Sequence, residues 1–222
     1  MEHSRKRKRT ESFDINWGDS DNEMDLYYGK ANNSKTILME EKFIYTIGNE
    51  IHFTCDINKA SIQEIIKQMT QLIHDHKKNA NGEPDKLTIV YIVDSPGGSV
   101  TSILKFVDFI EVAKSKYPFV EFISIVTGLV ASAGTIMAIV ADKRFMTKNA
   151  HAMVHELSSG NSGKYTEFRS YVKFLDHLHD KLTNIYCKKT GKTKEEIEQL
   201  LKNETWFSAE DYLKYGFVDE LK

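Results

Sequence analysis

The sequence predicts an α/β fold built on a parallel sheet, and three observations favour it. Residues 87–93 are apolar at nearly every position, as in a strand that is covered on both faces. Segments with strand patterning alternate with segments whose apolar residues recur at helical spacing, as in strands joined by helical crossovers. The chain has 222 residues, 41% of them hydrophobic, which is enough for one substantial core. We therefore expect one folded domain over residues 36–222.

Residues 1–35 have a different composition. A basic run at residues 5–9 precedes six acidic residues, and residues 11–29 contain no lysine or arginine. Such blocks bury too little apolar surface to fold, so we expect a disordered charged tail. The basic run also fits a nuclear-localisation or nucleic-acid element, although five basic residues are a permissive match.

Composition excludes several classes of protein. The formal net charge of −2 provides no general basic field, so we expect no nucleic-acid partner. The two cysteines, Cys55 and Cys187, form no CxxC pattern, and the N-terminus has no apolar stretch typical of a signal peptide. These features predict a reducing, cytoplasmic setting. No apolar run is long enough for a transmembrane helix, so we expect no membrane partner.

The first half of the domain begins with strands predicted at residues 43–47 and 51–57. A helix should follow, with Ser61 as its N-cap and an apolar face between residues 62 and 73. The buried strand at residues 87–93 then leads into the sequence SPGG, a turn signal, before a helix predicted at residues 100–115.

The second half continues the alternation of strands and helices. We expect a strand at residues 119–126, a short helix after Ser132, and short strands at residues 144–146 and 152–154. A long helix at residues 165–188 carries an extended apolar stripe, which fits packing on another subunit or, alternatively, the core of a monomer. Helices at residues 194–202 and 208–215 close the chain.

Ser132 is the candidate nucleophile. Acyl transfer by serine requires a hydroxyl, a base, an orienting acid and N–H groups for the oxyanion. Ser132 lies at a helix start, where Ala133 offers one N–H, and the Gly97-Gly98 turn after a buried strand offers a second. A serine in this position is otherwise an ordinary helix cap.

His155 is the candidate base, because it ends a short strand at the sheet edge where a cleft is expected. His151 shares its face if the strand is regular, and is otherwise a surface residue. His177 and His179 point in different directions around a helix, so they cannot chelate one metal together. We expect no metal and no other cofactor.

Taken together, these segments resemble the proteolytic subunit of the Clp protease, the ClpP family of the ClpP/crotonase superfamily, over residues 43–219. The matching segments are DSPGGSV at 94–100, GLVASAG at 128–134, MVH at 153–155, GKYTE at 163–167, FSAE at 207–210 and YGFVD at 215–219. The resemblance implies a ClpP/crotonase-like α/β fold of repeated β-β-α units with a protruding handle helix.

The resemblance also implies site residues. Ser132 would be the nucleophile, His155 the general base, and the backbone N–H groups of Gly98 and Ala133 the oxyanion hole. The family's third catalytic residue is an aspartate, whereas this chain has Glu204 at that place. Asn203 replaces an arginine with which many relatives contact a neighbouring ring, so the pairing of rings is in question.

The implied function is that of a serine endopeptidase of the Clp type, which cleaves peptides and unfolded proteins inside a ring. The implied assembly is a homo-oligomer of heptameric rings, possibly two stacked, fed by a Clp-type ATPase. The chain offers no nucleotide site of its own, because Tyr186 occupies the first glycine position of the P-loop pattern that ends at Gly191-Lys192-Thr193.

Three other interpretations stay open. Crotonases hold a thioester enolate without a Ser-His pair, whereas this chain has both residues. Signal-peptide-peptidase relatives use a Ser-Lys dyad, but no lysine falls at a matching motif. A catalytically inactive ClpP-like structural or peptide-binding subunit is the third, and the departures at Asn203 and Glu204 favour it.

Overall fold

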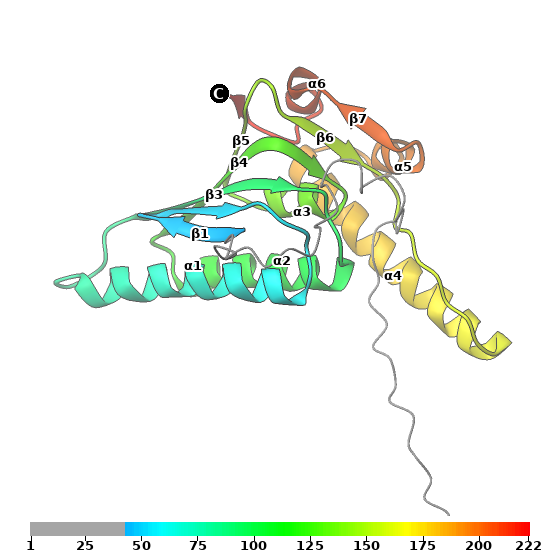
Figure 1. Cartoon of the computed structure of the whole chain (residues 1–222), viewed down its shortest axis with the longest axis horizontal. Coiled ribbons are helices and arrows are strands. Elements are labelled where there is room, and N and C mark those ends of the chain that lie inside the picture. Colours follow the sequence, from blue (N-terminus) through cyan, green and yellow to red (C-terminus); the bar gives the residue numbers. More distant parts are fainter. Residues whose placement is uncertain (1–42) are drawn as a thin grey trace, which may run out of the picture.

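An eight-stranded sheet runs through residues 43–222, the part of the chain that the computed structural model describes (Figure 1). In this part the strands are β1 (Ile44–Ile47), β2 (Glu50–Phe53), β3 (Leu87–Ser95), β4 (Val120–Ala131), β5 (Lys143–Met146), β6 (His151–Val154), β7 (Thr205–Phe207) and β8 (Glu220–Leu221). The helices in the same range are α1 (Lys59–Asn79), α2 (Val100–Lys116), α3 (Ala133–Ile139), α4 (Tyr165–Thr190), α5 (Lys194–Lys202) and α6 (Ala209–Lys214). The predicted tail, its basic run and the start of the domain at residue 36 lie outside the described residues.

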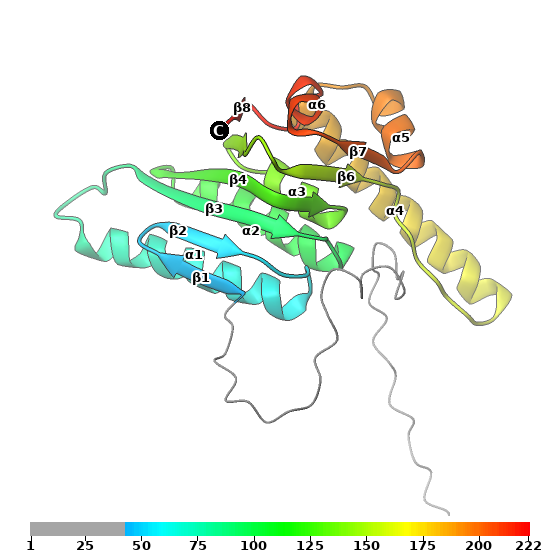
Figure 2. The same ribbon diagram turned by 45° about the horizontal axis from the view of Figure 1, so that its top comes forward.

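The predicted α/β fold is confirmed. The strand order is β1-β2-β3-β4-β5-β8, and β6 pairs with β4 and β7. All neighbours are parallel except the pairs β1/β2 and β6/β7. Helices α1 and α2 lie along one face of the strands, and α4 projects away from the body (Figures 1 and 2). This placement buries one face of β3, where Ile89, Tyr91 and Val93 are fully inaccessible to solvent. The residues of the other face are only partly covered, so the prediction of a strand covered on both faces is not met in the single chain.

Strand β4 is longer than predicted. It continues from Val126 through Gly128 to Ala131, pairing first with β5 and then with β6. Gly128 has a φ of 57° and leaves room for the Asp94 carboxylate, which accepts a hydrogen bond from the Leu129 N–H at 3.1 Å. A glycine that normally signals the end of a strand here lets the strand change partners. The extension carries the chain to Ser132.

The predicted N-cap of the first helix was wrong. Helix α1 begins at Lys59, and Asn58 is its cap, with Oδ1 accepting from the N–H groups of Ala60 and Ser61. The Ser61 hydroxyl instead accepts from the Asn58 N–H at 2.9 Å, which completes a capping box. Asparagine and serine are equally good caps, so their preferences did not distinguish the two positions.

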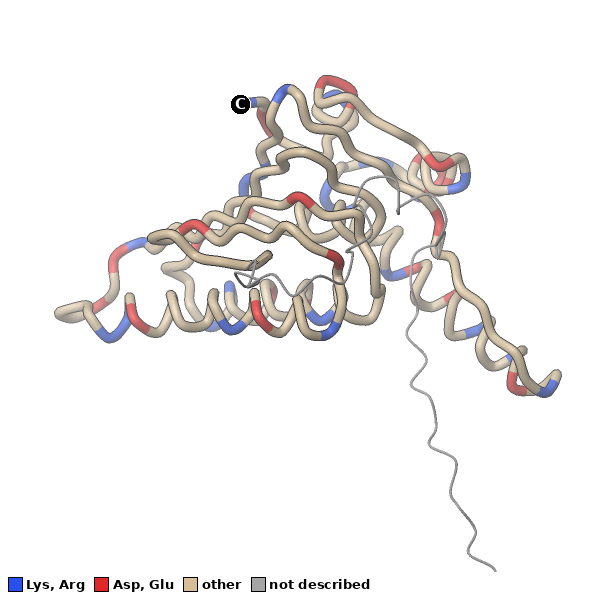
Figure 3. Tube along the Cα trace, in the orientation of Figure 1, with Lys and Arg blue, Asp and Glu red and all other residues tan. Residues whose placement is uncertain are grey.

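The apolar stripe of α4 divides into two halves. Leu178, Leu182 and Tyr186 are buried in the body of the domain. The projecting N-terminal half exposes large hydrophobic side chains on the single chain: Tyr165, Phe168, Val172 and Phe174. Charged residues of both signs are interspersed over the helices and loops, as the trace of Figure 3 shows. The described surface therefore carries an apolar segment on α4, and other exposed hydrophobic residues at β1, α2 and β7, rather than a field of one sign.

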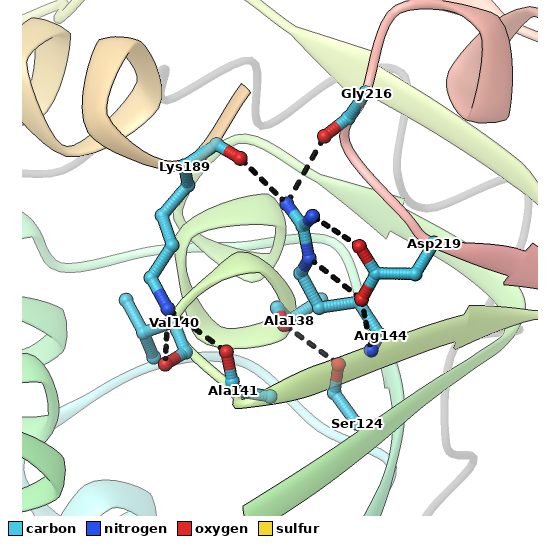
Figure 4. Close-up of polar contacts among 8 residues, drawn as sticks. All are labelled: Ser124, Ala138, Val140, Ala141, Arg144, Lys189, Gly216 and Asp219. Carbon is cyan, nitrogen blue, oxygen red and sulfur yellow. Dashed lines mark hydrogen bonds and ion pairs between the residues drawn. The ribbon is translucent and has the colours of Figure 1, made fainter. Parts of the chain in front are cut away.

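Buried and half-buried polar contacts fix the C-terminal end of α3 (Figure 4). The Lys189 ammonium donates to the carbonyls of Val140 at 2.9 Å and Ala141 at 2.8 Å, where the helix dipole favours a cation. Burial lowers the pKa of Lys189 to about 8. Arg144 of β5 pairs with Asp219 and donates to the Lys189 carbonyl at 3.0 Å, so α3, α4 and the C-terminal segment are joined here.

Candidate active site

Ser132 lies between the last residue of β4 and the first residue of α3. Its φ of 55° and ψ of −127° belong to a region that non-glycine residues rarely adopt. Its hydroxyl makes no capping hydrogen bond, so the interpretation as an ordinary helix cap fails. Ser132 Oγ lies instead 3.0 Å from His155 Nε2. Strain at a residue whose hydroxyl meets an imidazole is typical of a nucleophile.

Three hydrogen bonds hold the Ser132 backbone in this conformation. Its N–H donates to the Met153 carbonyl of β6 at 2.9 Å. Its carbonyl accepts from the Thr135 N–H at 3.1 Å and from Thr135 Oγ1 at 2.6 Å. These bonds stabilise a conformation that otherwise costs about 1–3 kcal/mol.

The turn after β3 packs directly on Ser132. A Cβ added to Gly97, which has a φ of 103°, would lie 2.7 Å from Ser132 Cβ and 3.0 Å from the Ala133 nitrogen. The next residue, Gly98, bridges to Ile57, which donates to the Gly97 carbonyl and accepts from the Ser99 N–H. Because the groups that bond to Ile57 are the Gly97 carbonyl and the Ser99 N–H, the Gly98 N–H between them points away from Ile57. Only residues without a side chain permit such a close approach.

Two backbone donors are therefore available beside Ser132. Ala133 is the first residue of α3, so its N–H has no acceptor within the helix. The hydrogen bonds within residues 43–222 use neither this N–H nor that of Gly98. Both sequence-predicted oxyanion donors thus lie on segments that meet at Ser132, at the edge where β3, β4 and β6 end.

His155 directly follows β6 and is half-buried. Burial lowers the pKa of its imidazole, and the negative charges of Glu204 and Glu156 act in the opposite direction. The ring is consequently neutral at neutral pH, as a general base must be. His151, at the other end of β6, is exposed. The described residues contain no cluster of three or more His, Cys, Asp or Glu side chains placed to hold a metal ion.

Glu204 lies between α5 and β7, and its side chain is exposed. Strand β7 pairs with β6 so that Thr205 is opposite Val154, which brings Glu204 to the side of His155. Its φ of 46° is left-handed, a second strained non-glycine residue at this edge. The neighbouring Asn203 uses its amide to donate to the Gln199 carbonyl at 2.8 Å, at the end of α5.

Sequence reasoning missed two residues beside the site. Thr135 and Tyr186 are both fully buried, and their hydroxyl oxygens lie 2.6 Å apart. The available signal was weak: a threonine inside the apolar run of α3, and a tyrosine within the stripe of α4. Only the packing of α4 on α3 brings the two hydroxyls together.

Comparison with known proteins shows what the chain is similar to. A protein-family model described as Clp protease matches residues 38–222. The "ATP-dependent Clp protease proteolytic subunit" of Streptococcus gordonii is 32% identical over 178 residues, covering 75% of this chain and 88% of the relative. Subunit 1 of Chlamydia muridarum is 28% identical over 173 residues, with 76% and 83% coverage. Subunit 2 of Tropheryma whipplei is 27% identical over 171 residues, with 72% and 92% coverage. No helix within residues 43–222 is long and apolar enough to span a bilayer.

Proposed function

This chain belongs to the Clp protease family, and we propose that it is an active serine endopeptidase that cleaves peptides and unfolded proteins. The observation that carries the proposal is the strained Ser132, whose Oγ lies 3.0 Å from His155 Nε2 instead of capping α3. A hydroxyl used only for structure has no need of this conformation or this partner.

Each residue has a distinct role in the proposed mechanism. His155 accepts the Ser132 proton as Oγ attacks the carbonyl carbon of the scissile bond. The N–H groups of Gly98 and Ala133 donate to the oxyanion that forms. The protonated His155 then donates to the leaving amine, and in the second half-reaction it activates the water that hydrolyses the acyl-enzyme.

Glu204 is the proposed third member. Its negative charge acts on His155 and stabilises the imidazolium that forms in each half-reaction. Glutamate occupies this role in other Ser-His enzymes, so the longer side chain is chemically compatible. Water screens an exposed carboxylate. We therefore expect Glu204 to stabilise the imidazolium less than a buried aspartate would.

One competing interpretation is supported by a specific observation: the chain is a catalytically inactive subunit that assembles or binds peptides. Glu204 at the aspartate position favours it, whereas the Ser132 and His155 geometry opposes it. A crotonase-like enolate reaction would need the two N–H donors but would not require a base at Ser132 Oγ. Covalent labelling distinguishes these interpretations, because only the peptidase presents an activated hydroxyl.

The test is reaction of the full chain with a fluorophosphonate probe, followed by mapping of the modified residue by mass spectrometry. We expect modification of Ser132, and loss of labelling in Ser132→Ala and His155→Ala. Ser208 is the matched control, because its hydroxyl is an ordinary N-cap that accepts from the Asp211 N–H at 3.1 Å. Label that persists in Ser132→Ala, or an unreactive folded parent protein, would contradict the proposal.

Membership of the family implies assembly into rings that work with Clp ATPases. We propose homo-oligomeric, heptameric rings in which the exposed apolar half of α4 pairs one ring with another. Tyr165 is 74% exposed and Phe168 48% exposed on the single chain, which is unusual for large hydrophobic side chains that stay in water. The relatives named above are proteolytic subunits of ATP-dependent proteases, so we propose a separate ATPase that delivers unfolded substrates.

Native mass spectrometry tests the assembly. We expect multiples of seven subunits, with Phe168→Ser and Val172→Ser converting stacked rings to single rings. Val112→Ser is the control, because Val112 is an exposed hydrophobic residue on α2. Asn203 lacks the bidentate guanidinium of arginine, so weak stacking in the parent protein fits the proposal. A monomer at micromolar concentration would contradict it.

A further inference from the structure

A buried chain of hydroxyl groups links α4 to the Ser132 backbone. Tyr186 of α4 and Thr135 of α3 are 51 positions apart in sequence, and their oxygens lie 2.6 Å apart. Thr135 Oγ1 lies 2.6 Å from the Ser132 carbonyl oxygen. Neither side chain is accessible to solvent, so water cannot replace these bonds.

The direction of the hydrogen bonds follows from counting protons. The Ser132 carbonyl can only accept, so Thr135 must donate its one hydroxyl proton to it. The Tyr186 hydroxyl must therefore donate to Thr135 Oγ1. Burial raises the pKa of Tyr186, which keeps the phenol protonated at neutral pH. The result is a one-way chain from Tyr186 through Thr135 to the Ser132 carbonyl.

The Ser132 carbonyl belongs to the same planar peptide group as the Ala133 N–H. In a trans peptide these two bonds point in opposite directions, so fixing one fixes the other. Thr135 donates to this carbonyl twice, through its N–H at 3.1 Å and through Oγ1. Donation to the carbonyl also polarises the group and makes its N–H a better donor.

We propose that Thr135 and Tyr186 are positioning residues that aim and polarise the Ala133 N–H at the oxyanion. This inference rests on the proposed function, because it assigns a role within the same oxyanion hole. Neither residue touches substrate; both act through one peptide group. The contribution exists when the oxyanion forms, so it should appear in kcat and leave KM unchanged.

The structure supplies a matched control for Tyr186. Tyr212 of α6 is also fully buried, and both rings pack on Phe217, at centroid distances of 5.7 Å for Tyr186 and 4.7 Å for Tyr212. The Tyr212 hydroxyl, unlike that of Tyr186, has no hydrogen-bond partner in the described part of the chain. Tyr186→Phe and Tyr212→Phe therefore remove the same atom from the same aromatic cluster, and only the first interrupts the chain to Ser132.

The experiment measures peptide turnover and the affinity of a peptide boronate, whose tetrahedral adduct places an anionic oxygen in the oxyanion hole. We expect Tyr186→Phe to lower kcat about tenfold, which equals about 1.4 kcal/mol of transition-state stabilisation. Boronate affinity should fall by a similar factor, with KM unchanged. Thr135→Val should lower kcat and boronate affinity at least as much as Tyr186→Phe does. Thr135→Ser should retain most of the activity, and Tyr212→Phe should have the kcat and boronate affinity of the parent protein.

A double-mutant cycle adds a second criterion. Since Tyr186 acts only through Thr135, the double variant Tyr186→Phe with Thr135→Val should have a kcat no lower than that of Thr135→Val alone. The inference fails if Tyr186→Phe equals Tyr212→Phe in kcat and boronate affinity, or if the two losses add. A parent protein that neither labels at Ser132 nor cleaves peptides would instead refute the proposed function, so the two failures are distinguishable.

Discussion

Gly97→Ala is expected to lower the activity of the protein strongly without unfolding it. The new Cβ would lie 2.7 Å from Ser132 Cβ and from the Ala131 carbonyl oxygen, whereas ordinary contact begins at 3.4 Å. The turn and Ser132 must therefore separate by at least about 0.7 Å, since both contacts are with the strained segment that carries the proposed nucleophile. A displacement of about 1 Å at a reacting group costs up to about 10²-fold in rate. We expect kcat/KM for a fluorogenic peptide to fall by about that factor.

Gly82→Ala is the control that separates backbone strain from the contact with Ser132. Gly82 has a similar φ of 115°, but a Cβ added there would meet nothing within 4 Å. Gly82→Ala thus carries the same kind of conformational cost without the contact at Ser132. We expect both variants to lower the melting temperature and only Gly97→Ala to lose activity. Equal activities in two folded variants would refute the argument that the turn positions Ser132.

Two further predictions concern His155. Glu204→Gln should lower kcat strongly, by at most about 10⁴-fold, while Glu204→Asp changes it much less and the oligomer measured by native mass spectrometry is retained. Unchanged turnover in Glu204→Gln would leave Ser132 and His155 as a dyad. For pH dependence, the lowered pKa of His155 places the acid limb of kcat/KM below pH 6.5, because the base stays neutral to lower pH. Glu156→Gln removes a negative charge that raises the pKa of His155. The pH profile of kcat/KM should therefore show the acid limb at still lower pH, with little change in the plateau value. A shift of the limb to higher pH would contradict the assignment of the limb to His155.

The sequence was sufficient for the fold because periodicity reports burial. The nearly continuous apolar run at β3 predicted a strand covered on both faces; the structure confirms the strand, but only the face with Ile89, Tyr91 and Val93 is buried in the single chain. The ends of helices and strands were less well predicted where two residues are equally good N-caps, or where a glycine lies within a strand without ending it. The predicted strand ended at residue 126, two residues before Gly128, yet the room that Gly128 leaves for the Asp94 carboxylate and the change of partner from β5 to β6 carry β4 on to Ala131.

The candidate site was predictable only in part. Ser132, His155 and the Gly97-Gly98 turn stood at recognisable positions relative to strand ends, and those ends meet at one edge of the sheet. The strain at Ser132 and the missing capping bond were not predictable, because a φ angle depends on the tertiary hydrogen bonds that hold it. These features distinguish the proposed nucleophile from an ordinary helix cap.

The shortness of α3 explains why distant residues are needed to build this site. A helix of seven residues is not stable in isolation, so its position is set by what contacts its two ends. Lys189 holds the C-terminal end through the carbonyls of Val140 and Ala141, and Tyr186 reaches the N-terminal end through Thr135. Both residues come from one turn of α4, the helix whose other half projects from the body (Figure 1). The same helix that we propose to pair the rings therefore also fixes the peptide group that carries the Ala133 N–H, and the geometry at Ser132 depends on how α4 is seated.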